Sequence, residues 1–178
     1  MMKRTTLVMV CTWEMEFMGK TMNNLLTRLS YDPTSGIVTW KDGKRKGQRA
    51  GGLDPRGYRV IAPIDGWFLE HRLIFALMGE AIPEEVDHID RNRSNNTWSN
   101  LRASTCEENN QNKGAISTSK TGIKGVSPIG NGTWRGSVYY KGNNLRKTFK
   151  CIIDAEKWVI EKRKELHGKF AYIGDSDV

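Results

Sequence analysis

The spacing of hydrophobic and polar residues divides the first part of the chain into short helices and strands. Apolar residues recur at helical spacing in 23–29 and in 70–78, which predicts two helices. A short apolar run at 37–40 and an alternating segment at 58–64 predict two strands. Between these strands, residues 43–57 are rich in Gly, Lys and Arg, so we expect a mobile basic loop there.

A different pattern begins after the small polar residues of 114–121, which are typical of a linker. Three strand-like segments follow at 124–127, 133–140 and 145–150, separated by turns rich in Gly and Asn. Asp154 can cap a final helix that has one apolar face. The order of elements predicts an α+β protein whose chain ends in a small three-stranded antiparallel sheet packed on one helix.

The charge of the chain favours a phosphate-rich partner. The 178 residues carry a formal net charge of +8, of which +7 lies in residues 113–178, so we expect a basic binding module there. No apolar run approaches the ~20 residues that a membrane span needs, and we expect no membrane contact. The three widely spaced cysteines fit a reducing cytoplasm. Residues 1–19 are expected to form an N-terminal extension.

The polar segment 86–102 carries the most specific chemistry in the sequence. It places Asp87 directly before His88 and then repeats Asn at short intervals. A carboxylate, a titratable imidazole and orienting amides are the groups that metal-assisted hydrolysis of a phosphodiester requires. Carboxylate and amide oxygens suit Mg²⁺ or Mn²⁺, so we expect one divalent ion of this kind.

Residues 23–113 resemble the HNH endonuclease family in its phage and intron-encoded form. The motifs that carry the resemblance are Tyr31-Asp32-Pro33-x-x-Gly36-x-x-x-Trp40, Gly57-Tyr58, His71-Arg72-Leu73, Asp87-His88, Asn100-Leu101-Arg102 and Glu108-Asn109-x-x-Asn112. The resemblance implies a nuclease domain over 20–113 with a ββα-metal fold, in which two strands and a helix surround one divalent ion.

The same resemblance implies a role for each matching residue. Asp87 matches the metal-binding carboxylate, and His88 matches the general base that activates water. Asn100 matches the residue that orients this imidazole. Asn109 matches the second metal ligand, and an Asp/Asn pair favours Mg²⁺ or Mn²⁺ over zinc. His71 sits inside an apolar helix pattern, so we expect a buried packing residue rather than a catalyst.

Residues 122–171 resemble the DNA-binding domain of plant ethylene-response factors. The motifs that carry this second resemblance are Gly122-Ile123-Lys124-Gly125-Val126, Gly132-Thr133-Trp134, Val138, Lys147-Thr148-Phe149, Asp154-Ala155-Glu156 and Trp158. It implies a sheet that lies in the DNA major groove. Independently of the resemblance, alternation places Trp134, Gly136 and Val138 toward the helix, and Arg135, Ser137 and Tyr139 toward DNA.

These observations together predict a metal-dependent endonuclease that acts on double-stranded DNA without a small-molecule cofactor. A homing or mobile-element role, a phage source and the host cytoplasm are implied. The residues expected to contact DNA are Lys44, Arg45, Lys46, Arg49, Lys124, Arg135, Ser137, Tyr139, Arg146 and Lys147. Two alternatives are a DNA-binding regulator with a vestigial nuclease core and an RNA-processing nuclease. The sequence leaves monomer and homodimer open, and we expect 172–178 to be a tail.

Overall fold

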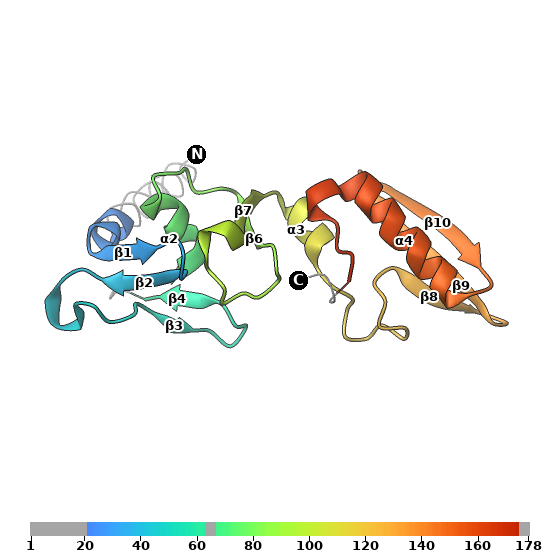
Figure 1. Ribbon diagram of the computed structural model, residues 1–178, viewed down its shortest axis with the longest axis horizontal. Helices are drawn as coiled ribbons and strands as arrows, with labels where there is room; N and C mark the ends of the chain where they lie inside the picture. Colours follow the sequence, from blue (N-terminus) through green and yellow to red (C-terminus); the bar gives the residue numbers. More distant parts are fainter. Residues whose placement is uncertain (1–20, 63–66, 175–178) are drawn as a thin grey trace, which may run out of the picture. The chain divides into compact units, whose positions relative to one another are not determined.

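The computed structural model describes residues 21–62 and 67–174, which fall into two compact units (Figure 1). The expected N-terminal extension, 1–19, lies outside the described residues. Each unit has a hydrophobic core of its own. Of the described residues, unit 1 comprises 21–62, 67–88 and 92–103, and unit 2 comprises 89–91 and 104–174.

Unit 1 combines small antiparallel sheets with one central helix. Residues 21–27 are helical. The elements that follow are β1 (Leu29–Asp32), β2 (Ile37–Trp40), η1 (Gly43–Arg45), β3 (Gly52–Leu53), β4 (Arg59–Ile61), β5 (Phe68–Leu69), α2 (Glu70–Leu77), β6 (Glu85–His88), η2 (Trp98–Asn100) and β7 (Leu101–Ser104). Strand β1 pairs with β2, β4 lies between β3 and β5, and β6 pairs with β7. Leu29, Val38, Ile61, Leu73 and Ile74 form the centre of the core and are almost fully buried.

The basic loop of unit 1 is more ordered than its composition predicts. The backbone of Trp40 donates to Gln48 O at 3.0 Å, and Gly47 donates back to Trp40 O at 2.9 Å. Isolated bridges join the same segment to β2. These bonds pin the predicted mobile loop to β2. The predicted strand 58–64 is also shorter than expected, because β4 ends at Ile61 and residues 63–66 lie outside the described part.

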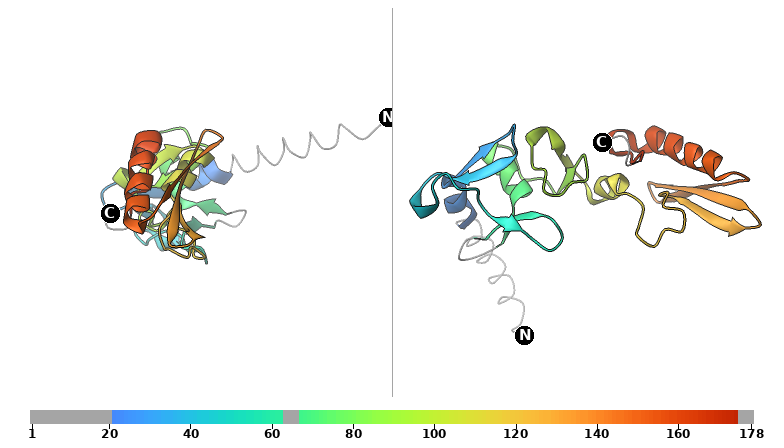
Figure 2. Two further views of the ribbon diagram at one scale, coloured as in Figure 1. Left: turned by 90° about the vertical axis from the view of Figure 1, so that its right-hand side faces the viewer. Right: turned by 60° about the horizontal axis from the view of Figure 1, so that its bottom comes forward.

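Unit 2 is built around a three-stranded antiparallel sheet with a helix on one face (Figure 2). Its elements are α3 (Cys106–Asn112), β8 (Val126–Gly130), β9 (Thr133–Tyr140), β10 (Asn143–Phe149), α4 (Ile152–His167) and η3 (Gly168–Phe170), with β9 in the centre of the sheet. Val126, Val138, Ala155 and Val159 are the buried residues of the core. A Cβ on Gly136 would lie 2.8 Å from the Trp158 ring, so a glycine is needed for α4 to approach this closely.

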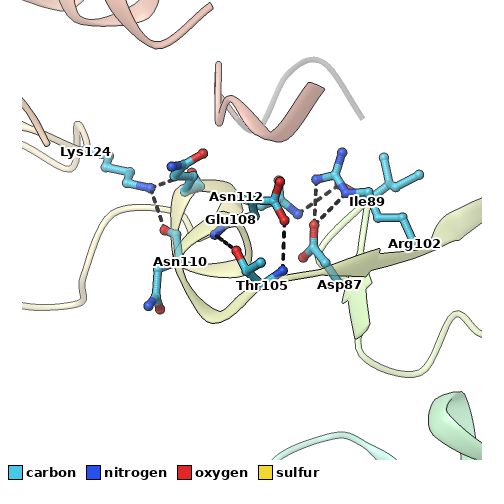
Figure 3. Close-up of polar contacts among 9 residues, drawn as sticks. Asp87, Ile89, Arg102, Thr105, Glu108, Asn110, Asn112 and Lys124 are labelled. Atoms are coloured by element: carbon cyan, nitrogen blue, oxygen red, sulfur yellow. Dashed lines mark hydrogen bonds and ion pairs between the residues drawn. The ribbon is translucent and has the colours of Figure 1, made fainter. Parts of the chain in front are cut away.

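The two helices in unit 2 start in different ways. Thr105 caps α3, and it forms a reciprocal capping box with Glu108 (Figure 3). Helix α4 begins earlier than predicted, with Cys151 rather than Asp154 at the N-cap. The apolar Ile152 packs against the core of unit 2, so the helix starts there. The carboxylate of Asp154 instead lies in the first turn, where the helix dipole favours a negative charge.

The boundary between the units lies before α3, whereas the sequence predicts a nuclease domain to 113 and a linker at 114–121. The physical reason is Lys124, which precedes β8 and caps the end of α3. Its ammonium donates to Gln111 O at 2.8 Å and Lys113 O at 2.6 Å, and more weakly to Asn110 O. These bonds fasten α3 to the C-terminal unit.

Tyr172, in the expected tail, also contributes to unit 2, because three cations lie over its ring. The Arg91 guanidinium carbon lies 4.6 Å from the centre of the ring, the Lys124 ammonium 5.6 Å and the Arg163 guanidinium carbon 5.8 Å. Among the residues that the structure describes, no helix has the length and apolar character needed to cross a membrane.

Candidate active site

Strand β6 presents Asp87 and His88 in succession, so the two side chains leave the strand on opposite faces. Asp87 Oδ2 accepts hydrogen bonds from Arg102 Nε at 2.8 Å and Arg102 Nη2 at 2.5 Å (Figure 3). Arg102 belongs to β7, the partner of β6, so this ion pair crosses the two-stranded sheet. The planar guanidinium therefore fixes the orientation of the Asp87 carboxylate.

The neighbours of the His88 imidazole include an amide and two aromatic rings. Its Nε2 lies 2.9 Å from Asn96 Oδ1. The His71 ring meets it edge-on, with the ring centres 5.1 Å apart, and the Tyr58 ring centre lies 6.2 Å away. His71 is only 4% exposed, which confirms the expected buried position. These neighbours leave His88 little freedom to rotate.

Asn96 connects His88 to a buried ion pair. Its Nδ2 donates to Glu70 Oε1 at 3.0 Å, and Glu70 Oε2 accepts from Arg59 Nε at 3.1 Å. Glu70 is fully buried and Asn96 is 1% exposed. A buried carboxylate is costly unless it is paired and hydrogen-bonded, and Arg59 and Asn96 meet that need. The four side chains form a continuous hydrogen-bonded chain, Arg59–Glu70–Asn96–His88, which we call the buried relay.

The turn between β1 and β2 pins the loop that carries Asn96. The Tyr31 hydroxyl donates to Asn96 O at 2.8 Å, and the backbone of Trp98 donates to Pro33 O at 3.0 Å. Burial, with help from the negative charges of Asp32 and Glu70, raises the pKa of Tyr31 to about 12, so its hydroxyl stays protonated.

Gly36 brings the same turn into backbone contact with the loop. A Cβ on Gly36 would lie 2.6 Å from the carbonyl carbon of Asn96, and closer still to Thr97 N. The residues Tyr31, Pro33 and Gly36 of the sequence motif therefore act by holding the loop beside His88.

Asn100 holds this loop from its other end. Its Nδ2 donates to Asn95 O at 2.8 Å, and Asn95 Oδ1 in turn accepts from the Thr97 hydroxyl at 3.1 Å. The acceptor beside His88 Nε2 is Asn96 Oδ1, which lies four residues before Asn100, the predicted orienting residue. Asn109, the predicted second ligand, lies in α3 of unit 2, where its N–H donates to Thr105 O at 3.0 Å.

The buried relay includes three residues to which the sequence assigned no catalytic role. Arg59 and Glu70 are charged residues inside segments that otherwise read as buried strand and helix. Charged side chains are almost never fully buried unless they are paired, so their positions were a signal to look for a partner. Asn96 reads only as a loop residue, because Asn is common in turns. Its contact with Glu70 spans 26 residues, which no local pattern reveals.

The predicted DNA-contact residues of unit 1 are all exposed. They lie in the basic loop: Lys44, Arg45, Lys46 and Arg49. The Arg45 guanidinium carbon lies 5.9 Å from the centre of the Trp40 ring, which holds it near β2. The loop therefore presents cations on a fixed backbone.

Strand register separates the predicted DNA-contact residues of unit 2. Gly136 and Val138 face α4, as predicted, so their neighbours in β9 face away from it. Arg146 pairs with Ser137 across β9 and β10, and directly paired residues project to the same face. We call this surface the open face of the sheet: Arg135, Ser137, Tyr139 and Arg146.

Two predicted DNA-contact residues lie apart from the open face. Lys147 pairs with Gly136, so it projects from the face that carries α4. Lys124 binds the carbonyls at the end of α3. Burial, followed by the charges of Arg163, Lys113 and Arg91, lowers the pKa of Lys124 to about 8. Neither lysine therefore belongs to the open face: Lys147 projects from the opposite face of the sheet, and Lys124 is bound to α3.

Comparison with known proteins identifies a nuclease domain. The chain is 43% identical over 123 residues to an uncharacterized HNH endonuclease of Acanthamoeba polyphaga mimivirus, covering 67% of this chain and 63% of that protein, which is less than two thirds of its length. A family model described as HNH endonuclease matches residues 68–111. The chain is a nuclease with an HNH domain. This HNH nuclease is also 33% identical over 87 residues to Protein 3.8 of Escherichia phage T7, covering 48% of the chain and 72% of the relative. No solved structure matches it significantly.

Replacing Gly36 by Ala should destabilise the HNH nuclease more than the same change at Gly43. Both glycines have φ of 70°, where an L-residue costs about 1–2 kcal/mol. A Cβ at Gly43 meets only the flexible end of Arg28 at 3.6 Å, whereas one at Gly36 strikes the loop backbone. Gly36→Ala should therefore lose a further ~1–3 kcal/mol of unfolding free energy. Urea unfolding of both variants measures the difference, and equal losses would show that the turn does not clamp the loop.

Acid should destabilise unit 1 through His71. Burial, with the charges of His88 and Arg72, lowers the pKa of His71 to about 3. An unfolded histidine titrates near pH 6.5, so between these values the unfolded state binds a proton that the folded state does not. Stability should therefore fall as the pH drops below about 6.5. His71→Phe should flatten this dependence by up to ~1.4 kcal/mol per pH unit in urea unfolding. An unchanged slope would mean that His71 does titrate in the folded state.

Proposed function

We propose that this HNH nuclease is a metal-dependent endonuclease of double-stranded DNA, with His88 as its general base. The observation that carries the proposal is the Asp87-His88 pair, in which each side chain is held separately. Arg102 orients the carboxylate, and the buried relay orients the imidazole. A general base contributes ~10²–10⁴ in rate, but only when it is positioned toward the proton that it removes.

In the proposed reaction, His88 takes a proton from a water molecule, and the resulting hydroxide attacks the scissile phosphorus. The bond to the 3′ oxygen of the leaving nucleotide breaks, and that oxygen takes a proton from solvent. The products carry 5′-phosphate and 3′-hydroxyl ends, as the family resemblance implies. When His88 takes the proton it becomes a positively charged imidazolium. The negative charge of the buried Glu70 carboxylate stabilises this imidazolium.

The donor groups of the chain fit a hard divalent ion such as Mg²⁺ or Mn²⁺. Within the described residues, no group of three or more His, Cys, Asp or Glu side chains could hold a metal ion, which disfavours a protein-only cage. Mg²⁺ commonly binds through one or two carboxylates, with substrate phosphate and water completing its shell. A carboxylate offers about four lone-pair sites, so Asp87 can serve both Arg102 and an ion.

We propose Asp87 as the metal-binding carboxylate and Asn109 as the second ligand. Asp87 belongs to unit 1 and Asn109 to unit 2, so this pairing rests on the sequence motif alone. A bound ion would neutralise charge on the scissile phosphate and the leaving oxygen.

We propose that the C-terminal sheet binds DNA in the manner of the plant domains that it resembles. The open face offers two guanidinium groups, a hydroxyl and a tyrosine ring, and it lies in the part of the chain that carries a charge of +7. Arg contacts both phosphate and guanine edges, whereas Ser and Tyr adapt to several partners. The basic loop of unit 1 adds phosphate contacts near the nuclease site.

A homing or mobile-element role is the biological setting that we propose for this pairing of modules. Relatives in a phage and in a giant virus are consistent with a mobile gene. The alternative of a DNA-binding regulator with a vestigial nuclease core is less well supported. A vestigial site has no need for a buried relay behind His88, and the relay is intact here.

Removing the imidazole should abolish cleavage and spare binding. His88→Ala should lower the rate of plasmid cleavage in Mg²⁺ or Mn²⁺ by ~10²–10⁴, with DNA affinity within a few-fold of wild type. The measurements are nicked and linear product over time, and DNA binding by the same preparation. Excess chelator should stop the wild-type enzyme. Cleavage by His88→Ala at the wild-type rate, or cleavage in chelator, would contradict the proposal.

Neighbouring cations on opposite faces of β10 provide a matched test of the open face. Arg146→Gln should weaken DNA binding and flatten the slope of log K against log salt by about 0.9 if one phosphate contact is lost. Lys147→Gln removes the same charge one residue later, from the face that carries α4, and should change both values much less. Binding measured at several salt concentrations gives both slopes. Equal effects of the two variants would mean that the open face does not direct binding.

A further inference from the structure

The hydrogen bonds of the buried relay run in one defined direction, which packing alone would not require. Its members alternate strictly between donors and acceptors, from the Arg59 guanidinium to the His88 ring. We propose that Glu70 and Asn96 are positioning residues that set the tautomer of His88, with the proton on Nε2 and the reactive lone pair on Nδ1. This inference rests on the proposed function of His88 as general base.

The two hydrogen bonds of Asn96 determine which way round its amide lies. A carboxylate that is paired with a guanidinium only accepts hydrogen bonds, so Asn96 must turn its donor Nδ2 toward Glu70 Oε1. The amide oxygen then faces His88 Nε2 at 2.9 Å, and an amide oxygen also only accepts. His88 must therefore donate from Nε2. In the neutral ring the remaining nitrogen, Nδ1, carries the lone pair that can take a proton from water.

Glu70 has a position that stability alone does not explain. It is fully buried, and its ion pair with Arg59 must offset the cost of removing two charges from water. A buried pair of this kind often contributes no net stability compared with apolar residues of similar volume. The pair does supply a fixed acceptor beside Asn96. Because the paired carboxylate accepts a hydrogen bond from Asn96, it holds the amide of Asn96 in one orientation.

Replacing one oxygen of Glu70 should invert the tautomer of His88. In Glu70→Gln, Arg59 still requires an acceptor, so the glutamine oxygen faces Arg59 and its NH₂ group faces Asn96. Asn96 then turns its amide over and presents Nδ2 to His88, which must accept at Nε2 and carry its proton on Nδ1. The base loses its reactive lone pair, so kcat for DNA cleavage should fall by about 10²–10⁴ with little change in KM.

A second exchange should restore the original tautomer. In the double variant Glu70→Gln/Asn96→Asp, the glutamine NH₂ donates to the new carboxylate, and that carboxylate accepts the proton of His88 Nε2. The double variant keeps one buried negative charge beside Arg59 and His88, so it also tests the proposal if Glu70→Gln fails to fold. Cleavage should return to within about tenfold of wild type, a rescue that a purely structural role for Glu70 does not predict.

The tautomer can be observed directly by ¹⁵N NMR of the full-length chain labelled at histidine. The chain has three histidines, and His88→Ala identifies the signals of His88 by their loss. Protonated and unprotonated ring nitrogens have well separated ¹⁵N shifts. The spectra are recorded near pH 8, where an ordinary imidazole is neutral. Wild type and the double variant should show a protonated Nε2, and Glu70→Gln a protonated Nδ1.

Glu84→Gln is the matched control, because it makes the same chemical change at an exposed carboxylate. It should leave the tautomer and the cleavage rate unchanged. The wild-type tautomer in Glu70→Gln, or a protonated Nδ1 in wild type, would overturn the proposal. If NMR shows the expected tautomers but the wild-type protein does not cleave DNA, the role of the relay is supported and the nuclease function is refuted. The two failures are therefore distinguishable.

Discussion

The organisation of unit 1 depends on one buried carboxylate. Glu70 stands at the first position of α2 with no exposed surface, so its charge must be satisfied inside the protein. Arg59 reaches it from β4, and Asn96 reaches it from the loop between β6 and β7. Arg59 also donates to Ala50 O at 3.0 Å, which connects the pair to the basic loop. One charge thus fixes a strand, a helix and two loops in a single arrangement.

Two different kinds of interaction hold the residues that we propose for nuclease chemistry. The buried relay fixes His88 by charge and hydrogen bonding. The β1–β2 turn fixes the loop that carries Asn96, by a backbone contact at Gly36 and by hydrogen bonds from neighbouring residues. Asp87 is positioned separately by Arg102. Because the two proposed reactive groups are held separately, the site we propose needs little reorganisation when a substrate binds.

The sequence predicted those features that depend on local pattern. Helix α2 and strand β9 lie where periodicity placed them, because a continuous apolar face determines each. The start of α4 was missed because the packing of Ile152 outweighs a good capping residue two positions later. The motifs predicted Asp87 and His88 as site residues, but they did not predict which side chains hold them. Arg59, Glu70 and Asn96 meet across 11 to 26 residues, and such pairings depend on the tertiary fold.

The hydrogen bonds between Lys124 and the end of α3 determine where this chain could be fused to a different C-terminal domain. The HNH match ends at residue 111, so the small polar residues of 114–121 form the apparent place to join a different C-terminal domain. A fusion made there would discard the ammonium that satisfies the last carbonyls of α3. The helix would then end unsupported in the chimera. A chimera that preserves α3 must therefore keep the original chain up to and including Lys124. The junction then lies inside unit 2, after Lys124, rather than in the linker-like residues of 114–121.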